Sequence, residues 1–262
     1  MLSPTQIQRF HEDGYAVVDG MLTPSEWHDL RDATQRIVAN PHGRASAAEY
    51  LQDQYATQWG VFSEHLWIDE ATAESAVLRV RDNPRARAVA SALLNVEAKA
   101  SRISMQIMYP RCGCKQPWHQ DHTPGDRNLW WINCMYYLEE MTSENGSLLV
   151  VPGSHRTPLN RRLPDYGPIP GSVRVLPKPG AAVFFYMSIL HAADEHLGPE
   201  PRRGVKTHYS LPHIDPLDHR HEQRYARGVR RRGHEILRAD DGVHSFWFAE
   251  EEPVAAERNS YA

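Results

Sequence analysis

The feature that most restricts the fold is a change of period near Arg102, after which apolar residues tend to recur at every second position. This spacing is typical of strands, and turn sequences such as Asn-Gly and Pro-Gly interrupt it. We expect strands at residues 102–110, 118–121, 129–138, 147–151, 181–190 and 204–211. Short strands separated by such turns favour a jelly-roll double sheet.

Helix signals dominate the chain before this change. Residues 3–6, Ser-Pro-Thr-Gln, have the form of a capping box with proline in the first turn, and Gly14 can end that helix. Similar starts stand at 23–26 and 83–84, with a short strand expected at 15–20. We therefore predict a mostly β fold with helices: a double-stranded β-helix (jelly-roll, cupin-like) core with a helical layer packed outside it.

The length and composition fit one domain. The chain has 262 residues, 41% of them hydrophobic, and we find no internal repeat or low-complexity linker. We expect a single domain over 1–262, made of a helix-rich part (1–100), a jelly-roll core (101–211) and a C-terminal extension (212–262). Residues 40–75 follow no period and form either an ordered loop across a binding site or plain surface.

Charge and hydropathy argue against two classes of partner. The formal net charge of −4 gives no reason to expect nucleic acid or an anionic membrane. No apolar run is long enough for a membrane span, and the first residues lack the features of a signal peptide, so we expect a cytoplasmic protein. Arginines are dense within 219–238, but few aromatic residues accompany them, and a solvated helix face is the preferred interpretation.

Residues 117–121, Pro-Trp-His-Gln-Asp, carry the clearest chemical signal. In an extended strand His119 and Asp121 project to the same side, while Gln120 points away. One imidazole and one carboxylate then converge on one point. They supply two thirds of the two-histidine, one-carboxylate triad that holds ferrous iron on one face and leaves the opposite positions open.

Two residues farther along the chain can complete such a site. His191 follows a predicted strand, and ligands in a barrel converge from strands that are adjacent in space rather than in sequence. Arg202 stands eleven positions later, and arginine can grip a carboxylate through two parallel hydrogen bonds at any relevant pH.

These residues, together with Glu-Asn-Gly-Ser at 144–147, Pro-Gly-Ser-His at 152–155 and the opening segment 14–20, resemble the phytanoyl-CoA dioxygenase family of iron(II)/2-oxoglutarate oxygenases. The resemblance extends from about residue 5 to residue 211. It implies an Fe(II)- and O2-dependent dioxygenase of the hydroxylase type that oxidises an unactivated C–H bond of a small organic molecule while converting 2-oxoglutarate to succinate. We expect a specialised metabolite as substrate, and the sequence indicates no oligomeric state.

The resemblance also assigns roles to residues. His119, Asp121 and His191 would be the iron ligands, and Arg202 would hold the distal carboxylate of 2-oxoglutarate. Relatives that transfer halide carry a small residue in place of the carboxylate, so Asp121 favours hydroxylation or a related oxidation. Polar residues on neighbouring strands, Asn133 and Gln106, would touch the co-substrate, and the substrate pocket would be lined by Trp118, Arg127, Trp131 and the aromatic residues Trp59 and Trp67.

Several alternatives stay open from the residues themselves. A zinc hydrolase could use the same triad, with a general base among Glu139, Glu140 and Asp194. A non-catalytic jelly-roll protein that binds a small ligand or a metal would keep the strands without needing Arg202. A separate metal site could form from Cys112 and Cys114 with His119 or His122, or from His208, His213, His219 and His221, but reduced thiols and scattered surface histidines are the commoner cases.

Overall fold

The computed structural model describes residues 2–39, 64–67, 74–108, 115–121, 131–157 and 167–211. Its helices are α1 (Pro4–Asp13), α2 (Pro24–Ala39), α4 (Ser75–Arg81) and α5 (Pro84–Leu94), with a short 3-10 helix η3 (Ser154–Arg156). Its strands are β1 (Tyr15–Val18), β2 (Glu64–Trp67), β3 (Lys99–Met108), β4 (Gln116–His119), β5 (Trp131–Tyr137), β6 (Leu148–Val150), β7 (Val173–Val175), β8 (Ala182–Tyr186), β9 (His191–Ala193) and β10 (Arg202–Ser210).

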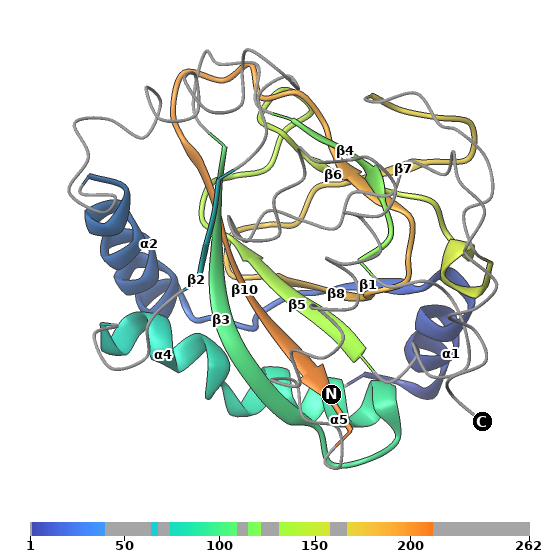
Figure 1. Cartoon of the computed structure of the whole chain (residues 1–262). Coiled ribbons are helices and arrows are strands. Elements are labelled where there is room, and N and C mark those ends of the chain that lie inside the picture. The colour runs from blue at the N-terminus through green and yellow to red at the C-terminus, as the bar shows by residue number, and fades with distance from the viewer. Residues whose placement is uncertain are drawn as a thin grey trace, which may run out of the picture.

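The strands form two antiparallel sheets (Figure 1). The larger has the order β1-β8-β5-β10-β3-β2, and the smaller has the order β4-β9-β6-β7. Apolar side chains from both sheets pack between them, including Met135 and Phe185 from the larger sheet and Leu148 and Val150 from the smaller. This arrangement confirms the predicted jelly-roll class.

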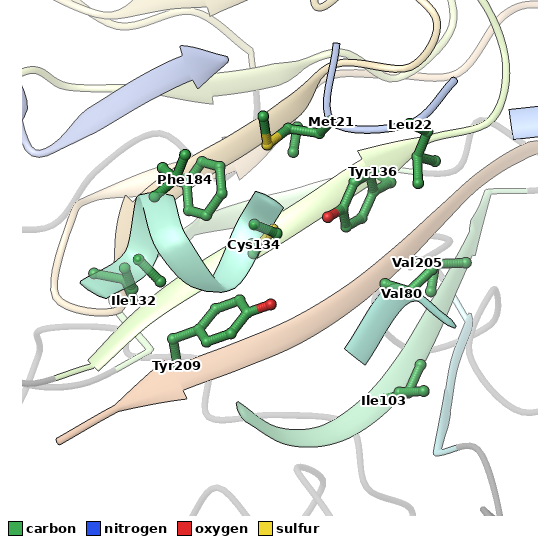
Figure 2. Close-up of a cluster of buried hydrophobic side chains, with 14 of the residues drawn as sticks. Met21, Leu22, Val80, Ile103, Ile132, Cys134, Tyr136, Phe184, Val205 and Tyr209 are labelled. Atoms are coloured by element: carbon green, nitrogen blue, oxygen red, sulfur yellow. The ribbon is translucent and has the colours of Figure 1, made fainter. Parts of the chain in front are cut away.

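The helices cover the outer face of the larger sheet, as predicted (Figure 1). Phe10 of α1, Leu30 of α2, Val80 of α4 and Leu93 of α5 join one buried cluster with the outward-facing residues of β3, β5, β8 and β10. Figure 2 shows the hydroxyl groups of Tyr136 and Tyr209 directed toward Cys134 within this cluster. The burial of apolar area on this face is the main force that holds the layer in place.

Local sequence signals account for the ends of the helices. Ser3 caps α1 and exchanges two hydrogen bonds with Gln6, and Gly14 ends the helix with a left-handed φ of 86°. Asn83 caps α5 by accepting from the first backbone N–H groups of the helix, and Pro84 follows it. Both predicted helix starts are confirmed. They could be read from the sequence because each cap depends on residues within one helical turn.

Other predictions of elements were wrong. The strand expected at 181–190 is β8 followed by a turn and then by β9, so the chain leaves the larger sheet and enters the smaller one just before His191. Helix α4 and strands β2 and β7 were not predicted. The C-terminal extension lies outside the described residues, and the domain boundaries stay a prediction.

Candidate metal centre

The ends of two neighbouring strands place the two histidines of the predicted triad side by side. β4 and β9 pair antiparallel in the smaller sheet, with His119 directly opposite His191. Their ring centroids lie 4.1 Å apart, and both side chains are buried. The neighbouring residues Leu148 and Val150 on β6 belong to the apolar cluster between the sheets, so the histidines face the interior of the sandwich.

Backbone hydrogen bonds fix which nitrogen each histidine presents. Nδ1 of His119 lies 2.8 Å from the carbonyl of Pro117, and Nδ1 of His191 lies 2.9 Å from the carbonyl of Ile189. A carbonyl only accepts, so both Nδ1 atoms carry hydrogen and both Nε2 atoms keep a lone pair. This is the tautomer in which a metal-binding histidine donates its other ring N–H to a fixed acceptor.

Asp121 supplies the carboxylate from a bend beyond the end of β4. Its Oδ1 lies 3.5 Å from Nε2 of His119, and its Oδ2 lies 3.9 Å from Nε2 of His191. One ligand atom from each of the three residues lies within 4.8 Å of the others. The predicted convergence is therefore present, although the reason given for it was wrong, because Asp121 is not part of the strand.

The electrostatics of the three groups suit a divalent cation. Burial, followed by the nearby His119, lowers the pKa of His191 to about 3, so its imidazole is neutral and able to bind a metal. Burial raises the pKa of Asp121, but the charge of Lys206 and the contacts with His191 and His119 outweigh this effect and hold the pKa well below its usual range. Two histidine nitrogens and one carboxylate form a ligand set that fits Fe(II) with open coordination positions.

Asn133 on β5 fixes the carboxylate from the opposite sheet. Its Nδ2 donates to Oδ2 of Asp121 at 2.9 Å, and its side chain is fully buried. Such an outer partner orients a ligand and is often needed for full metal affinity. The contact of Asn133 with the co-substrate stays a prediction, and the structure adds a direct contact with a triad residue.

Arg202 begins β10 and is almost fully buried, with 1% of its surface exposed. Its Nη1 donates to Oε1 of Gln106 at 3.0 Å, its Nη2 donates to the carbonyl of Gly146 at 2.7 Å, and its guanidinium lies over the ring of Tyr137 at 5.2 Å. These contacts are with neutral groups, so none of them neutralises the guanidinium. A buried cation held in this way is well suited to receive a carboxylate.

A row of side chains connects this arginine to the triad. Gln106, which accepts from Arg202, donates through Nε2 to Oε1 of Gln116 at 2.8 Å. Nε2 of Gln116 in turn lies 3.4 Å from Nε2 of His119, whose lone pair can accept from it. The two glutamines thus span the space between the cationic group and the metal-binding nitrogen.

The sequence did not reveal Gln116. In a regular strand residues three apart face opposite sides, so regular geometry would turn its side chain away from His119. The pairing of β4 with β9 is irregular between Gln116 and His119, and this irregularity brings both side chains to one side. No signal in a single sequence marks such a bulge.

The other predicted pocket residues lie in different places. Trp118 packs against Leu149 and Ala192 on the outer face of the smaller sheet, where its Nε1 donates to the carbonyl of Gly167 at 2.8 Å. It therefore points away from His119 and has a packing role. Trp131 is partly exposed at the start of β5, two residues from Asn133 and on the same face.

Several predicted residues cannot be placed. Arg127, Trp59, the two cysteines Cys112 and Cys114, and the histidines His122, His213, His219 and His221 lie outside the described residues, and so do the side chain of Trp67 and the arginine-rich stretch. Of the predicted histidine cluster only His208 is described, and it is buried on β10 opposite Asn133.

The acidic residues considered as a hydrolytic base are occupied or exposed. Both carboxylate oxygens of Glu139 accept from Arg203, at 2.6 Å from its backbone nitrogen and 2.8 Å from its Nε. Asp194 is paired with Arg174, and Glu140 is exposed. These contacts give a zinc hydrolase no available base among the three candidates.

Comparison with known proteins gives a consistent picture. A profile described as "Phytanoyl-CoA dioxygenase (PhyH)" matches residues 10–204. The ectoine dioxygenase of Streptomyces coelicolor is 25% identical over 78% of this chain and 76% of its own length.

Two solved structures share the fold. The carbocyclase SnoK from nogalamycin biosynthesis superimposes with a TM-score of 0.65 at 17% identity, covering 85% of this chain and 90% of its own. The epimerase SnoN, solved in complex with Fe3+, alpha ketoglutarate and nogalamycin RO, has a TM-score of 0.64 at 19% identity and covers 79% and 82% of the two chains. No helix in the described part of the chain is long and apolar enough to cross a membrane.

Proposed function

Because the chain belongs to the phytanoyl-CoA dioxygenase family of Fe(II)/2-oxoglutarate oxygenases, we propose that it uses His119, Asp121 and His191 to hold the iron and Arg202 to hold 2-oxoglutarate. The observation that carries this proposal is the connection of a buried arginine to a triad histidine through two glutamine side chains. A zinc hydrolase or a simple binding protein would have no need of that connection.

The residues of the chain would divide the work as follows. Nε2 of His119 and of His191 and a carboxylate oxygen of Asp121 would hold the metal, and Asn133 keeps the carboxylate in place through its hydrogen bond. When bound, Fe(II) with 2-oxoglutarate and O2 supplies the oxidising chemistry, in which 2-oxoglutarate is decarboxylated to succinate while a C–H bond of the substrate is oxidised.

Arg202 orients the co-substrate through its distal carboxylate, and the apolar side chains between the sheets limit the access of water. Gln106 and Gln116 lie between these two anchor points, where they can exchange their mutual hydrogen bonds for bonds to the co-substrate. We propose that the primary substrate is a small organic molecule, a specialised metabolite, and that its oxidation is a hydroxylation or a related hydrogen abstraction. The cytoplasmic location and the single domain belong to the same proposal.

The proposal is tested by adding Fe(II) and 2-oxoglutarate to the metal-free protein without oxygen and recording the weak visible charge-transfer band of the chelate. We expect the band in the wild-type protein and in a control, His28→Ala, which changes an exposed histidine on α2. We expect no band in His191→Ala. A wild-type protein without a band, or an undiminished band in His191→Ala, contradicts the assignment.

A further inference from the structure

A second cation faces the metal centre. Lys206 lies on β10 four residues after Arg202, and residues two and four apart in a strand share a face. Val205 packs in the cluster under the helices, so Lys206 projects the other way, into the space between the sheets. The lysine is partly exposed, whereas Arg202 is not.

The two cations are related to different members of the triad. Arg202 reaches His119 through the two glutamines. Lys206 is instead near enough to Asp121 to lower the pKa of its carboxylate, and it also lowers the pKa of His191. Four residues along a strand separate the two Cα atoms by about 13 Å. A dianion held by Arg202 can therefore bind without contact with Lys206.

A polar group without a partner lies beside the lysine. Ser104 on β3 is directly opposite Lys206, and its neighbours Ile103 and Met105 face the helices, so the serine faces the space between the sheets. Its side chain is fully buried, and its hydroxyl has no hydrogen-bond partner among the described residues. A buried hydroxyl of this kind is costly unless a ligand satisfies it.

The charges of the loaded site leave room for one more anion. Among the three described residues Asp121, Arg202 and Lys206, together with the expected Fe(II) and 2-oxoglutarate dianion, positive charge would exceed negative charge by one unit. Within the described part of the chain Lys206 forms no direct ion pair. An anionic group on the primary substrate would supply the missing charge.

We propose that Lys206, with the hydroxyl of Ser104 beside it, binds an anionic oxygen group, a carboxylate or a phosphate, of the primary substrate. This inference rests on the proposed function and names the class of molecule for it. The ammonium group fixes one end of the substrate, so that a C–H bond a short distance from the acid group is presented to the metal. Lysine suits this purpose because it is a compact point charge on a flexible stem.

The test uses the anaerobic complex with Fe(II) and 2-oxoglutarate and measures how added compounds perturb its visible band. The probes are matched pairs of small metabolites, each carboxylic acid with its primary amide and each phosphate monoester with its parent alcohol. We compare the wild-type protein with Lys206→Met, Lys206→Arg, Ser104→Ala and a control, Lys178→Met, which removes an exposed lysine from a turn.

We expect acidic probes to bind the wild-type protein and the control, and their amides or alcohols to bind about ten- to a hundredfold more weakly. Lys206→Met should weaken the binding of the acids by the same factor, and Ser104→Ala should weaken it by less. Lys206→Arg should keep part of the affinity for the acids. The affinity for 2-oxoglutarate should change less than about twofold in all of them.

Three results would overturn the inference. The first is that neutral probes bind as tightly as their acids, and the second is that the affinity of every acid is independent of Lys206. The third is that Lys206→Met weakens the binding of 2-oxoglutarate itself, which would mean that the lysine contacts the co-substrate. The absence of the band in the wild-type protein is a different failure, because it removes the proposed function and this inference with it.

Discussion

Replacement of Arg202 by methionine tests the anion site directly. Methionine matches the aliphatic part of the arginine side chain, so the change removes the charge and the donors while it keeps most of the apolar volume. Charge-assisted hydrogen bonds contribute about 1.5–3 kcal/mol, so we expect the dissociation constant for 2-oxoglutarate to rise about ten- to 150-fold. Arg202→Lys keeps the charge but loses the planar fork, and we expect an intermediate rise.

Arg203 offers a matched control on the next position of the same strand. It is also buried, but it faces the helix layer, where it pairs with Glu139 and donates through Nη1 to the carbonyl of Arg31 at 3.1 Å. Loss of one partner of a buried pair costs about 3–5 kcal/mol of stability, so Arg203→Met should be the less stable protein. It should nevertheless bind 2-oxoglutarate as the wild type does.

The assay is anaerobic titration of the Fe(II)-loaded proteins with 2-oxoglutarate, followed by the visible band, at a temperature at which urea unfolding shows each variant to be folded. A dissociation constant for Arg202→Met within about threefold of the wild-type value would refute the role of this arginine. An equal loss in Arg203→Met would show that the effect comes from general damage to β10.

Three further predictions follow from other contacts. Asn133→Ala removes the donor to Asp121 and should weaken Fe(II) binding about ten- to a hundredfold in a metal titration, and an unchanged affinity would contradict its orienting role. Burial, with the charge of Arg156, lowers the pKa of His11 and of His155 below the ordinary 6.5. Below about pH 6.5 the unfolded chain therefore binds more protons than the folded one, and the free energy of unfolding should fall. Urea unfolding at pH 7.5 and 5.5 should show a larger fall for the wild type than for His155→Gln, and equal falls would count against this. Gly14→Ala places a Cβ 2.4 Å from Nδ1 of His155 at a positive φ, whereas the Cβ of Gly20→Ala meets nothing within 4 Å at a similar φ. Gly14→Ala should therefore lower the free energy of unfolding by at least about 1 kcal/mol more than Gly20→Ala does.

The sequence predicted those features that depend on near neighbours or on residue chemistry. The caps at Ser3 and Asn83 are local, and the residue types at 119, 121, 191 and 202 limit the chemistry wherever they meet. It could not show how strands exchange sheets. The apolar run at 181–190 reads as one strand, and only the pairing of β9 with β4 shows that it turns before His191.

The remaining parts of the site depend on register and on faces. Gln116 reaches His119 because of an irregular pairing, and Lys206 becomes part of the site only when β10 is known to place Val205 against the helices. Trp118 shows the converse, since an aromatic residue next to a ligand histidine belongs to the opposite face of the same strand. Single-sequence reasoning gives the alternation along a strand, but it does not give which face is inside when both are apolar.

The position of Asp121 has a consequence for how such a site can change over time. Both histidines sit in the backbone ladder between β4 and β9, so their replacement alters the lining of the sheet itself. Asp121 lies at a bend outside that ladder, where its side chain accepts from Asn133 and contacts the two histidines. Substitution there removes no strand pairing, so new reactivity can be explored at this position by mutation or by design while the rest of the sandwich remains folded.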